Sequence, residues 1–324
     1  MWRSSPHQKY FSYRPGRGRW FLIIHLLPPQ RFAYLIIAHG EPYILERLVN
    51  IIDDPRNDIY ILFDKKSDLS LFKDISVCYS KLTFCEPVDI RWGDISQIVA
   101  ELSLFESAYE GGRYEYFHLI SGVDLPIKSQ DYIHAYFQRP ENKGKEFIHY
   151  VNTVGNMRDL KYKTQYYHWF TRFYRKRSLV SKAIVISIIR LSIILQKLFK
   201  INREYPFELK KGMNWCSLSC PGVEFLLSKK QELLKIFRNT LCPDEIFIQT
   251  LFWNYWNREL IHTDSIRLID WERGRPYTFS NSDYTELVNS EMLFARKFST
   301  SSSAFKEIVD IIYNLLKHSV NEHK

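Results

Sequence analysis

FAYLIIAH, residues Phe32–His39, is a continuous run of mostly apolar side chains that ends in a polar turn. Such a run is typical of a strand that is buried on both faces of a parallel sheet. The next segment, Glu41–Ile52, has apolar residues at helical spacing, and DIYILFD, Asp58–Asp64, is a second apolar run. Strand, helix and strand follow one another within about 30 residues, which is the size of a βαβ unit. These residues therefore predict a parallel sheet with helices packed against it.

The same alternation continues along most of the chain. It favours an α/β fold with an open, mainly parallel central sheet and helices on both faces. The further strands that we expect are Val88–Trp92, Glu115–Ser121, Phe147–Val151, Trp215–Ser219 and Ser265–Trp271. The further helices that we expect are Ser96–Ala108, Gly222–Phe237, one that starts at Pro243, Asp283–Ser290 and Ala304–His318. Residues 122–126 are expected to form a turn.

Three segments lie outside this alternating pattern. Residues 1–31 are mostly polar and basic, and their apolar run Phe21–Leu27 is too short to span a membrane, so we expect a poorly ordered N-terminal extension. Residues 158–211 hold 14 Lys or Arg and 3 Asp or Glu, which predicts a basic helical insert. Within this insert, Ala183–Phe199 is expected to be an interfacial or core-packed helix. Residues 301–324 are expected to hold a C-terminal helix.

Composition narrows the class of protein. The chain has 324 residues, of which 45% are hydrophobic and 25% are charged, and this excludes a mostly disordered protein. No run of 18 uncharged apolar residues occurs, so we expect no standard membrane span. The five cysteines form no Cys-x-x-Cys pair, which favours free thiols in a reducing compartment. The net charge of +9 is concentrated in the basic insert, and such a patch predicts an anionic neighbour.

Polar and aromatic side chains follow several of the expected strands. The carboxyl ends of parallel strands form the usual ligand crevice of an open sheet. A nucleotide would fit there, although the same residues could simply begin loops. The residues concerned are Ala38, His39, Asp64, Trp92 and Asp124.

The usual phosphate-binding motifs are missing from the sequence. Neither Gly-x-Gly-x-x-Gly nor the P-loop pattern occurs, and Asp64 is followed by Lys65 and Lys66 rather than by a second carboxylate. A metal ion that bridges a diphosphate normally needs carboxylate ligands. We therefore expect no metal site, and a diphosphate would have to be bound by fixed cations.

Fixed cations and a candidate base lie in the C-terminal third. Arg273 and Arg275 follow an expected strand, and the run FARKF contains Arg296 and Lys297 between aromatic residues. Arginine and lysine both bind phosphate oxygens, although a solvated basic loop is the alternative. Glu245 opens an apolar helix and is the candidate general base, although the helix dipole alone also favours an acidic residue there.

Seven segments, in this order, resemble the family of core-2/I-branching β-1,6-N-acetylglucosaminyltransferases and peptide O-xylosyltransferases. HLISGVDLPIKS, residues 118–129, is the most specific of them. The resemblance covers about residues 32–300 and is closest to bacterial members. The other segments are AYLIIAH (33–39), YILFDKKS (60–67), RWGDISQIVAEL (91–102), KGMNWCSLS (211–219), CPDEIFIQT (242–250) and LFARKF (293–298).

The resemblance implies a GT-A-like glycosyltransferase domain over residues 32–300, which transfers a sugar with inversion from a UDP-sugar and needs no essential metal or other cofactor. It gives Glu245 the role of the catalytic base and Lys297 that of a diphosphate ligand, with Arg273 or Arg275 as the partner cation. The uridine side is expected at Ala38, His39, Asp64 and Trp92. The sugar or acceptor is expected at Asp124, Asn214, Trp215 and Asp244.

Donor and acceptor are less closely defined. The xylosyltransferase branch has Asp where this chain has Asn214, which favours N-acetylglucosamine over xylose as the transferred sugar. The expected partners are the UDP-sugar, a glycan or lipid-linked glycan acceptor and an anionic membrane surface, and the expected location is the cytoplasm or the inner face of the membrane. The alternatives are xylosyl transfer, or a nucleic-acid-binding protein based on the basic aromatic run Tyr162–Lys182. No RNA-recognition or zinc-finger signature accompanies that run, so we expect no nucleic-acid partner.

Overall fold

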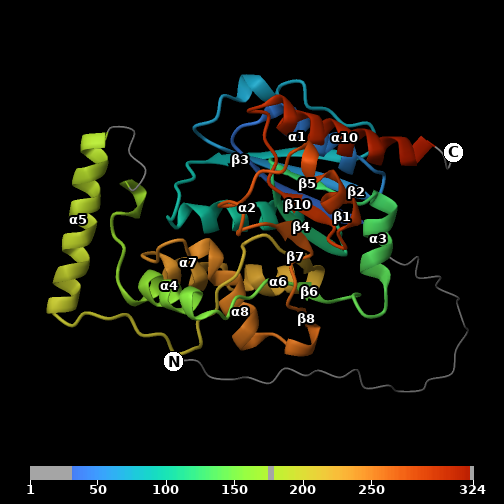
Figure 1. The fold of residues 1–324 in the computed structure, drawn as a ribbon. Helices are drawn as coiled ribbons and strands as arrows, with labels where there is room; N and C mark the ends of the chain where they lie inside the picture. Colours follow the sequence, from blue (N-terminus) through green and yellow to red (C-terminus); the bar gives the residue numbers. More distant parts are fainter. Residues whose placement is uncertain (1–30, 174–178, 322–324) are drawn as a thin grey trace, which may run out of the picture.

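The computed structural model describes residues 31–173 and 179–321, and it confirms the expected α/β fold class (Figure 1). A mainly parallel sheet has the strand order β3-β2-β1-β4-β7-β6-β8, and a smaller sheet has the order β5-β10-β9. The expected N-terminal extension lies, except for Arg31, outside the described residues.

The parallel half of the sheet is built from apolar runs. β1 (Phe32–Ala38) lies between β2 (Asn57–Asp64) and β4 (Tyr116–Ser121), and both neighbours run parallel to it. β3 (Lys81–Val88) extends the sheet beyond β2, also in parallel. The chain leaves β1 toward β2 and β3 and then returns to the other side of β1 as β4. The carboxyl ends of β1 and β4 therefore flank a topological switch point, where open sheets bind their ligands.

Short strands complete the two sheets. β7 (Ser217–Ser219) runs antiparallel to β4 and continues the large sheet toward β6 (Glu146–Phe147) and β8 (Ile261–His262). In the small sheet, β10 (Phe294–Arg296) lies between β5 (Asp124–Pro126) and β9 (Arg267–Ile269). The small sheet thus joins the segment after β4 to the C-terminal FARKF run.

Alternate residues of the central strands belong to two different hydrophobic clusters, one on each face of the sheet. In β1, Tyr34 and Ile36 belong to the cluster that includes side chains of α1, α3 and α10, whereas Ala33 and Leu35 belong to the cluster of α2, α6, α7 and α8. The sheet is therefore covered on both faces, as near-continuous apolar strands require. These helices are α1 (Pro42–Ile52), α2 (Ser96–Gly111), α3 (Gln130–Gln138), α6 (Cys220–Ser228), α7 (Lys230–Phe237), α8 (Phe247–Tyr255) and α10 (Ser303–Asn321), and the short α9 (Tyr284–Asn289) precedes β10.

The basic insert contributes two further helices. α4 (Val154–Gln165) lies against the body of the molecule, and α5 (Leu179–Leu198) stands at its periphery, well away from the sheet (Figure 1). The expected helix Ala183–Phe199 is therefore observed as a peripheral helix. Residues 174–178, which join it to the preceding segment, lie outside the described residues.

The expected strand Val88–Trp92 is wrong. The strand in this part of the chain is β3, Lys81–Val88, and only Val88 is shared. β3 is an edge strand with several exposed side chains, among them Lys81 and Glu86, so it lacks the apolar run that marks β1 and β2. Pro87 is tolerated there because an edge strand need not donate all of its N–H groups.

Three smaller expectations also change. The turn expected at residues 122–126 contains the short strand β5, whose partner β10 is distant in sequence. The single helix expected at Gly222–Phe237 is two helices, which meet at Lys229. Glu245 ends a 3-10 turn, Pro243–Glu245, and α8 begins only at Phe247. These pairings and breaks depend on tertiary contacts, which local periodicity does not report.

Candidate functional site

A cavity of about 560 Å³ lies beyond the carboxyl ends of the parallel strands. Its volume falls in the range usual for small-molecule sites. Its walls combine three tryptophans with charged and amide side chains. The lining residues are Ile37, Ile90, Trp92, Gln97, Glu101, His149, Val151, Asn156, Lys211, Gly212, Met213, Asn214, Trp215, Asp244, Glu245, Trp271, Pro276 and Arg296.

One group in the wall, the Glu245 cluster, consists of Glu245, Asp159, Lys163 and Lys211. The Glu245 carboxylate is 33% exposed, and its Oε2 atom lies 2.7 Å from the Nζ of Lys163 and 3.4 Å from that of Lys211. Both lysines also pair with Asp159. Burial would lower the pKa of Lys163, but Glu245 and Asp159 more than offset this, and the pKa is raised. The two ammonium groups therefore orient a carboxylate that still faces the cavity.

The backbone explains how Glu245 reaches this position. Gly212 donates its N–H to the Glu245 carbonyl oxygen at 2.9 Å. A Cβ atom at residue 212 would lie 1.7 Å from the His149 carbonyl oxygen, so only glycine permits this close approach. On the other side, Cys242 donates its N–H to the Gly93 carbonyl oxygen at 3.1 Å. The turn that carries Glu245 is thus attached to the backbone on both sides.

Two buried carboxyl groups lie beside Glu245 in the cavity wall. Asp244 accepts a hydrogen bond from Gln97 Nε2 at 2.7 Å, and Glu101 accepts one from Asn214 Nδ2 at 2.9 Å. Burial and the charge of Glu245 raise the pKa of Asp244 to about 7. Burial and the charge of Asp244 raise the pKa of Glu101 well above its ordinary range. This part of the wall therefore holds protons near neutral pH.

These two carboxyl groups also have unused acceptors. Glu101 Oε2 and Asp244 Oδ1 are buried and have no hydrogen-bond partner within the described part of the chain. Unsatisfied buried carboxyl oxygens are costly. A carboxyl group that holds a proton can donate as well as accept, and a ligand hydroxyl can serve either need. The wall is therefore suited to a polyhydroxylated ligand.

A second group in the wall, the Arg296 cluster, consists of Arg296, Asp124, Ser121 and Trp215. The Arg296 guanidinium lies 2.6 Å from Asp124 Oδ1, donates to Ser121 Oγ and stacks 4.5 Å from the centroid of the Trp215 ring. Asp124 is almost fully buried and also accepts from the Ser121 N–H at 2.8 Å. The pairing of β5 with β10 brings Asp124 opposite Arg296. The guanidinium is 20% exposed, and Arg296 lines the cavity.

The residues expected on the uridine side are only partly gathered. Trp92 lines the cavity, together with Ile37 and Ile90. Ala38 is buried at the end of β1, and His39 is exposed, with its carbonyl oxygen bonded to Ser67 Oγ. Asp64 pairs with Lys66 Nζ at 2.6 Å and does not line the cavity. Uridine binding by these residues stays a prediction.

The expected diphosphate ligands are placed unequally. Lys297 follows the last residue of β10, Arg296, but does not line the cavity, and exposed Arg275 precedes the lining residue Pro276. Arg273 is not brought to the cavity, because its guanidinium pairs with Asp270, Asp283 and Glu286. Of the cations singled out, the structure places only Arg296 in the wall itself. The expected sugar and acceptor residues Asn214, Trp215 and Asp244 line the cavity, and Asp124 lies behind Arg296.

Several site residues were missed by sequence reasoning. Glu101 carries a detectable signal, since it is a charged residue at a buried position of α2, on the face that also holds Ile98 and Phe105. Lys163 and Lys211 carry no such signal, because they belong to a segment in which many residues are basic. Only the folded chain shows that these two cations turn inward to Glu245.

Two further features are absent from the described residues. The described part of the chain holds no group of three or more His, Cys, Asp or Glu side chains placed to bind a metal ion. No helix in residues 31–173 or 179–321 combines the length and the apolar content needed to cross a bilayer.

Comparison with known proteins identifies relatives of similar sequence. Human xylosyltransferase 2 is 24% identical over a match that covers 87% of this chain and 34% of the human protein. β-Glucuronosyltransferase GlcAT14A of Arabidopsis thaliana is 24% identical, over 90% of this chain and 66% of the plant protein. The chain thus spans about a third of the length of the human relative. The crystal structure of apo mouse xyloside xylosyltransferase 1 aligns over 84% of this chain and 99% of that chain, with 11% identity and a TM-score of 0.38.

One protein-family profile also matches the chain. The profile of the family described as Core-2/I-Branching enzyme matches residues 32–292, most of the chain. This range contains the Glu245 cluster and ends just before Arg296. It confirms the family resemblance and, with the mainly parallel sheet, the GT-A-like fold class, and it supports a glycosyltransferase activity. The chain belongs to the Core-2/I-Branching enzyme family.

Proposed function

We propose that this protein transfers a sugar from a UDP-sugar to a hydroxyl group of a glycan, with inversion at the anomeric carbon and without an essential metal ion. The observation that carries the proposal is that one cavity, at the switch point of the sheet, is lined by both the half-buried carboxylate of Glu245 and the guanidinium of Arg296. The reaction needs a base at the acceptor and a cation at the leaving group, and these two residues supply them.

Glu245 acts as the general base. The acceptor hydroxyl gives its proton to the carboxylate while its oxygen forms a bond to the anomeric carbon. The bond between that carbon and the diphosphate oxygen breaks, and UDP leaves from the opposite face. Lys163 and Lys211 fix the direction of the carboxylate, and a fixed base is worth more than a mobile one because proton transfer depends on geometry.

Arg296 stabilises the leaving diphosphate. Its planar guanidinium can bind two phosphate oxygens at once, and Asp124 and Trp215 hold it in place before the substrate arrives. Lys297, which follows Arg296 in the chain, and Arg275, which precedes the lining residue Pro276, are the further cations that we propose for the diphosphate. Such preorganised cations can take over the role that a divalent metal plays in other transferases.

The buried carboxyl groups bear on the choice of sugar. Asp244 and Glu101, with their unused acceptors, are suited to bind donors on the transferred sugar or on the acceptor. N-acetylglucosamine supplies an amide N–H besides its hydroxyls, and it is the donor sugar that we propose first. Xylose and glucuronic acid are the alternatives, because the relatives are named for their transfer.

The proposal is tested with a panel of UDP-sugars. The full chain is incubated with UDP-N-acetylglucosamine, UDP-xylose and UDP-glucuronic acid, and release of UDP is measured with and without EDTA. We expect one donor to be turned over at the same rate in EDTA. Strict dependence on Mn²⁺ would contradict the metal-independent mechanism, and no turnover or stabilisation by any UDP-sugar would contradict the function.

A further inference from the structure

One side of α5 is an uncovered apolar stripe. Along the helix, large aliphatic side chains recur at spacings of three and four residues, so they lie on one face. Each of them is between 42% and 71% exposed. They are Ile184, Ile188, Leu191, Ile194, Leu195 and Leu198. A run of adjacent exposed aliphatic residues of this length marks an interaction surface.

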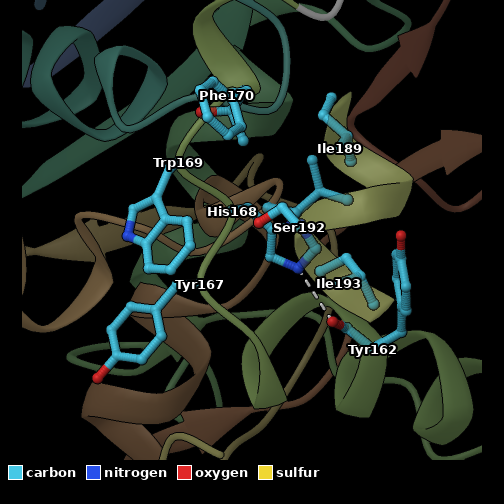
Figure 2. A pocket seen from close by; sticks show the side chains of 10 residues that line it. Tyr162, Tyr167, His168, Trp169, Phe170, Ile189, Ser192 and Ile193 are labelled. Atoms are coloured by element: carbon cyan, nitrogen blue, oxygen red, sulfur yellow. Dashed lines mark hydrogen bonds between the residues drawn. The ribbon is translucent and has the colours of Figure 1, made fainter. Parts of the chain in front are cut away.

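The opposite side of α5 is the side that packs on the molecule. Ile193 and Gln196 are buried, and the Gln196 amide accepts from the Tyr167 N–H at 2.8 Å and donates to the Tyr167 carbonyl oxygen at 3.0 Å. Figure 2 shows Ile189, Ser192 and Ile193 beside the segment from Tyr162 to Phe170, around a small cavity of about 50 Å³. The helix is therefore attached through one face, and the described residues leave the apolar stripe uncovered.

The charge around the stripe is of one sign. The described residues 171–173 and 179–200 contain five Lys or Arg and no Asp or Glu. Arg190 and Lys197 are exposed and lie seven residues, or about two helical turns, apart on one flank of the stripe. We propose that this face of α5 docks on an anionic lipid surface, with the aliphatic side chains in the boundary between headgroups and acyl chains and the cations at the phosphates.

A second copy of the chain fits the face less well. A two-fold dimer through α5 would place the same surface on both partners. The described residues 171–173 and 179–200 of each copy would then bring five cations and no carboxylate to the region of the contact. Like charges at a buried interface are unfavourable, whereas an anionic bilayer supplies both the missing negative charge and an apolar layer.

The stripe also fits the dimensions of an interfacial helix. α5 has 20 residues and is about 30 Å long. Exposed Arg190 lies near its middle, which suits a helix lying along the surface rather than across the bilayer. The insert reaches the candidate site through Lys163, and its Thr171 hydroxyl bonds to Asp94 at 2.9 Å. Docking through α5 would thus attach the part of the molecule that holds the cavity to the lipid surface.

Vesicle sedimentation tests the proposal with a matched pair of variants. Leu191→Ser/Leu195→Ser removes two side chains of the stripe, which are 56% and 43% exposed. Leu69→Ser/Leu71→Ser removes two leucines of similar exposure, 48% and 58%, from a short helical turn outside the insert. The full chain and both variants are sedimented with phosphatidylcholine vesicles that contain phosphatidylglycerol or do not.

We expect the wild type and the Leu69/Leu71 variant to bind the anionic vesicles at physiological ionic strength, and the Leu191/Leu195 variant to bind about tenfold more weakly. Neutral vesicles should retain little protein, and Arg190→Gln/Lys197→Gln should also weaken binding to anionic vesicles. Absence of binding by the wild type, or equal binding by the two leucine variants, would overturn the proposal. A wild-type dimer that Leu191→Ser/Leu195→Ser dissociates would show instead that a second copy covers the face.

Two controls keep the result interpretable. Circular dichroism and the melting temperature of the Leu191/Leu195 variant should match those of the wild type, because the changed side chains are exposed. Its stabilisation by UDP should also be unchanged, since α5 does not line the large cavity. Loss of vesicle binding can therefore be separated from failure of the proposed transferase function.

Discussion

The Glu245 cluster and the Arg296 cluster line the same cavity with opposite arrangements of charge. In the first, a carboxylate faces the cavity and two lysines hold it, while in the second a guanidinium faces the cavity and a carboxylate holds it. The surroundings differ as well. Glu245 is 33% exposed, whereas Asp124, the supporting carboxylate of the other cluster, is 4% exposed.

The difference separates two roles. A base must exchange a proton with a substrate hydroxyl and therefore has to present its carboxylate to the cavity. A cation that stabilises a leaving group acts best when its position is fixed before the reaction, and buried Asp124 together with Trp215 provides that rigidity. Substitutions in the two clusters should therefore affect different kinetic quantities.

The largest effect is expected for Glu245→Gln. The amide keeps the size of the side chain but cannot accept the proton, so kcat should fall by about a thousandfold. The affinity for UDP should stay within about threefold of the wild type, because the diphosphate is bound elsewhere. Steady-state kinetics and UDP titration measure the two quantities. Full activity in this variant would remove Glu245 from the mechanism.

A smaller effect is expected for Arg296→Gln, which should lower kcat/KM for the donor by about a hundredfold and weaken UDP binding. The substitution also leaves Asp124 buried without its counter-charge, which is destabilising. Arg296→Gln/Asp124→Asn removes both charges and should lose activity while recovering stability. Arg273→Gln is the matched control, and donor kinetics should change by less than about twofold, because this exposed arginine pairs with carboxylates outside the cavity.

The smallest effect is a change in stability with pH. The pKa of Asp244 rises from 3.8 to about 7 on folding, so the folded chain holds this proton more tightly than the unfolded chain. The stability that the folded chain gains by holding this proton is fully present below about pH 4 and is lost as the pH rises through about 7. Asp244→Asn cannot ionise. We therefore expect the melting temperature of Asp244→Asn minus that of the wild type to be larger at pH 8 than at pH 5.

Exposed Glu291 provides a control for this prediction. Glu291→Gln should show the same difference from the wild type at both pH values. If Asp244→Asn behaved like Glu291→Gln, the buried carboxyl pair would not hold a proton near neutral pH.

The buried strands could be predicted from sequence because their physical requirement is local. β1, β2 and β4 must be apolar on both faces, and their continuous apolar sequences indicate this directly. β3 needs an apolar side on one face only and tolerates Lys81 and Pro87, so its pattern resembles that of a loop. β5 and β10 are three residues long and exist because they pair with each other.

The candidate site likewise has residues that local sequence predicts and residues whose placement depends on tertiary contacts. The motifs single out Glu245, Asp244, Asn214 and Trp215, and these residues line one cavity, while their roles stay predictions. The choice among Arg273, Arg275, Arg296 and Lys297 could not be made from sequence, since all four are cations in polar or aromatic surroundings. It depends on which carboxylates each meets after folding, and Arg273 meets three whereas Arg296 meets one at the cavity wall.

The central claim is that UDP binds in this cavity to fixed cations, beside a carboxylate that it does not need for binding. Calorimetric titration of UDP in EDTA, with the wild type, Glu245→Gln and Arg296→Gln compared side by side, tests it most directly. The account predicts similar Kd values for the wild type and Glu245→Gln, and a Kd at least about tenfold higher for Arg296→Gln. No binding of UDP without a metal ion, or equal Kd values for the wild type and Arg296→Gln, would contradict it.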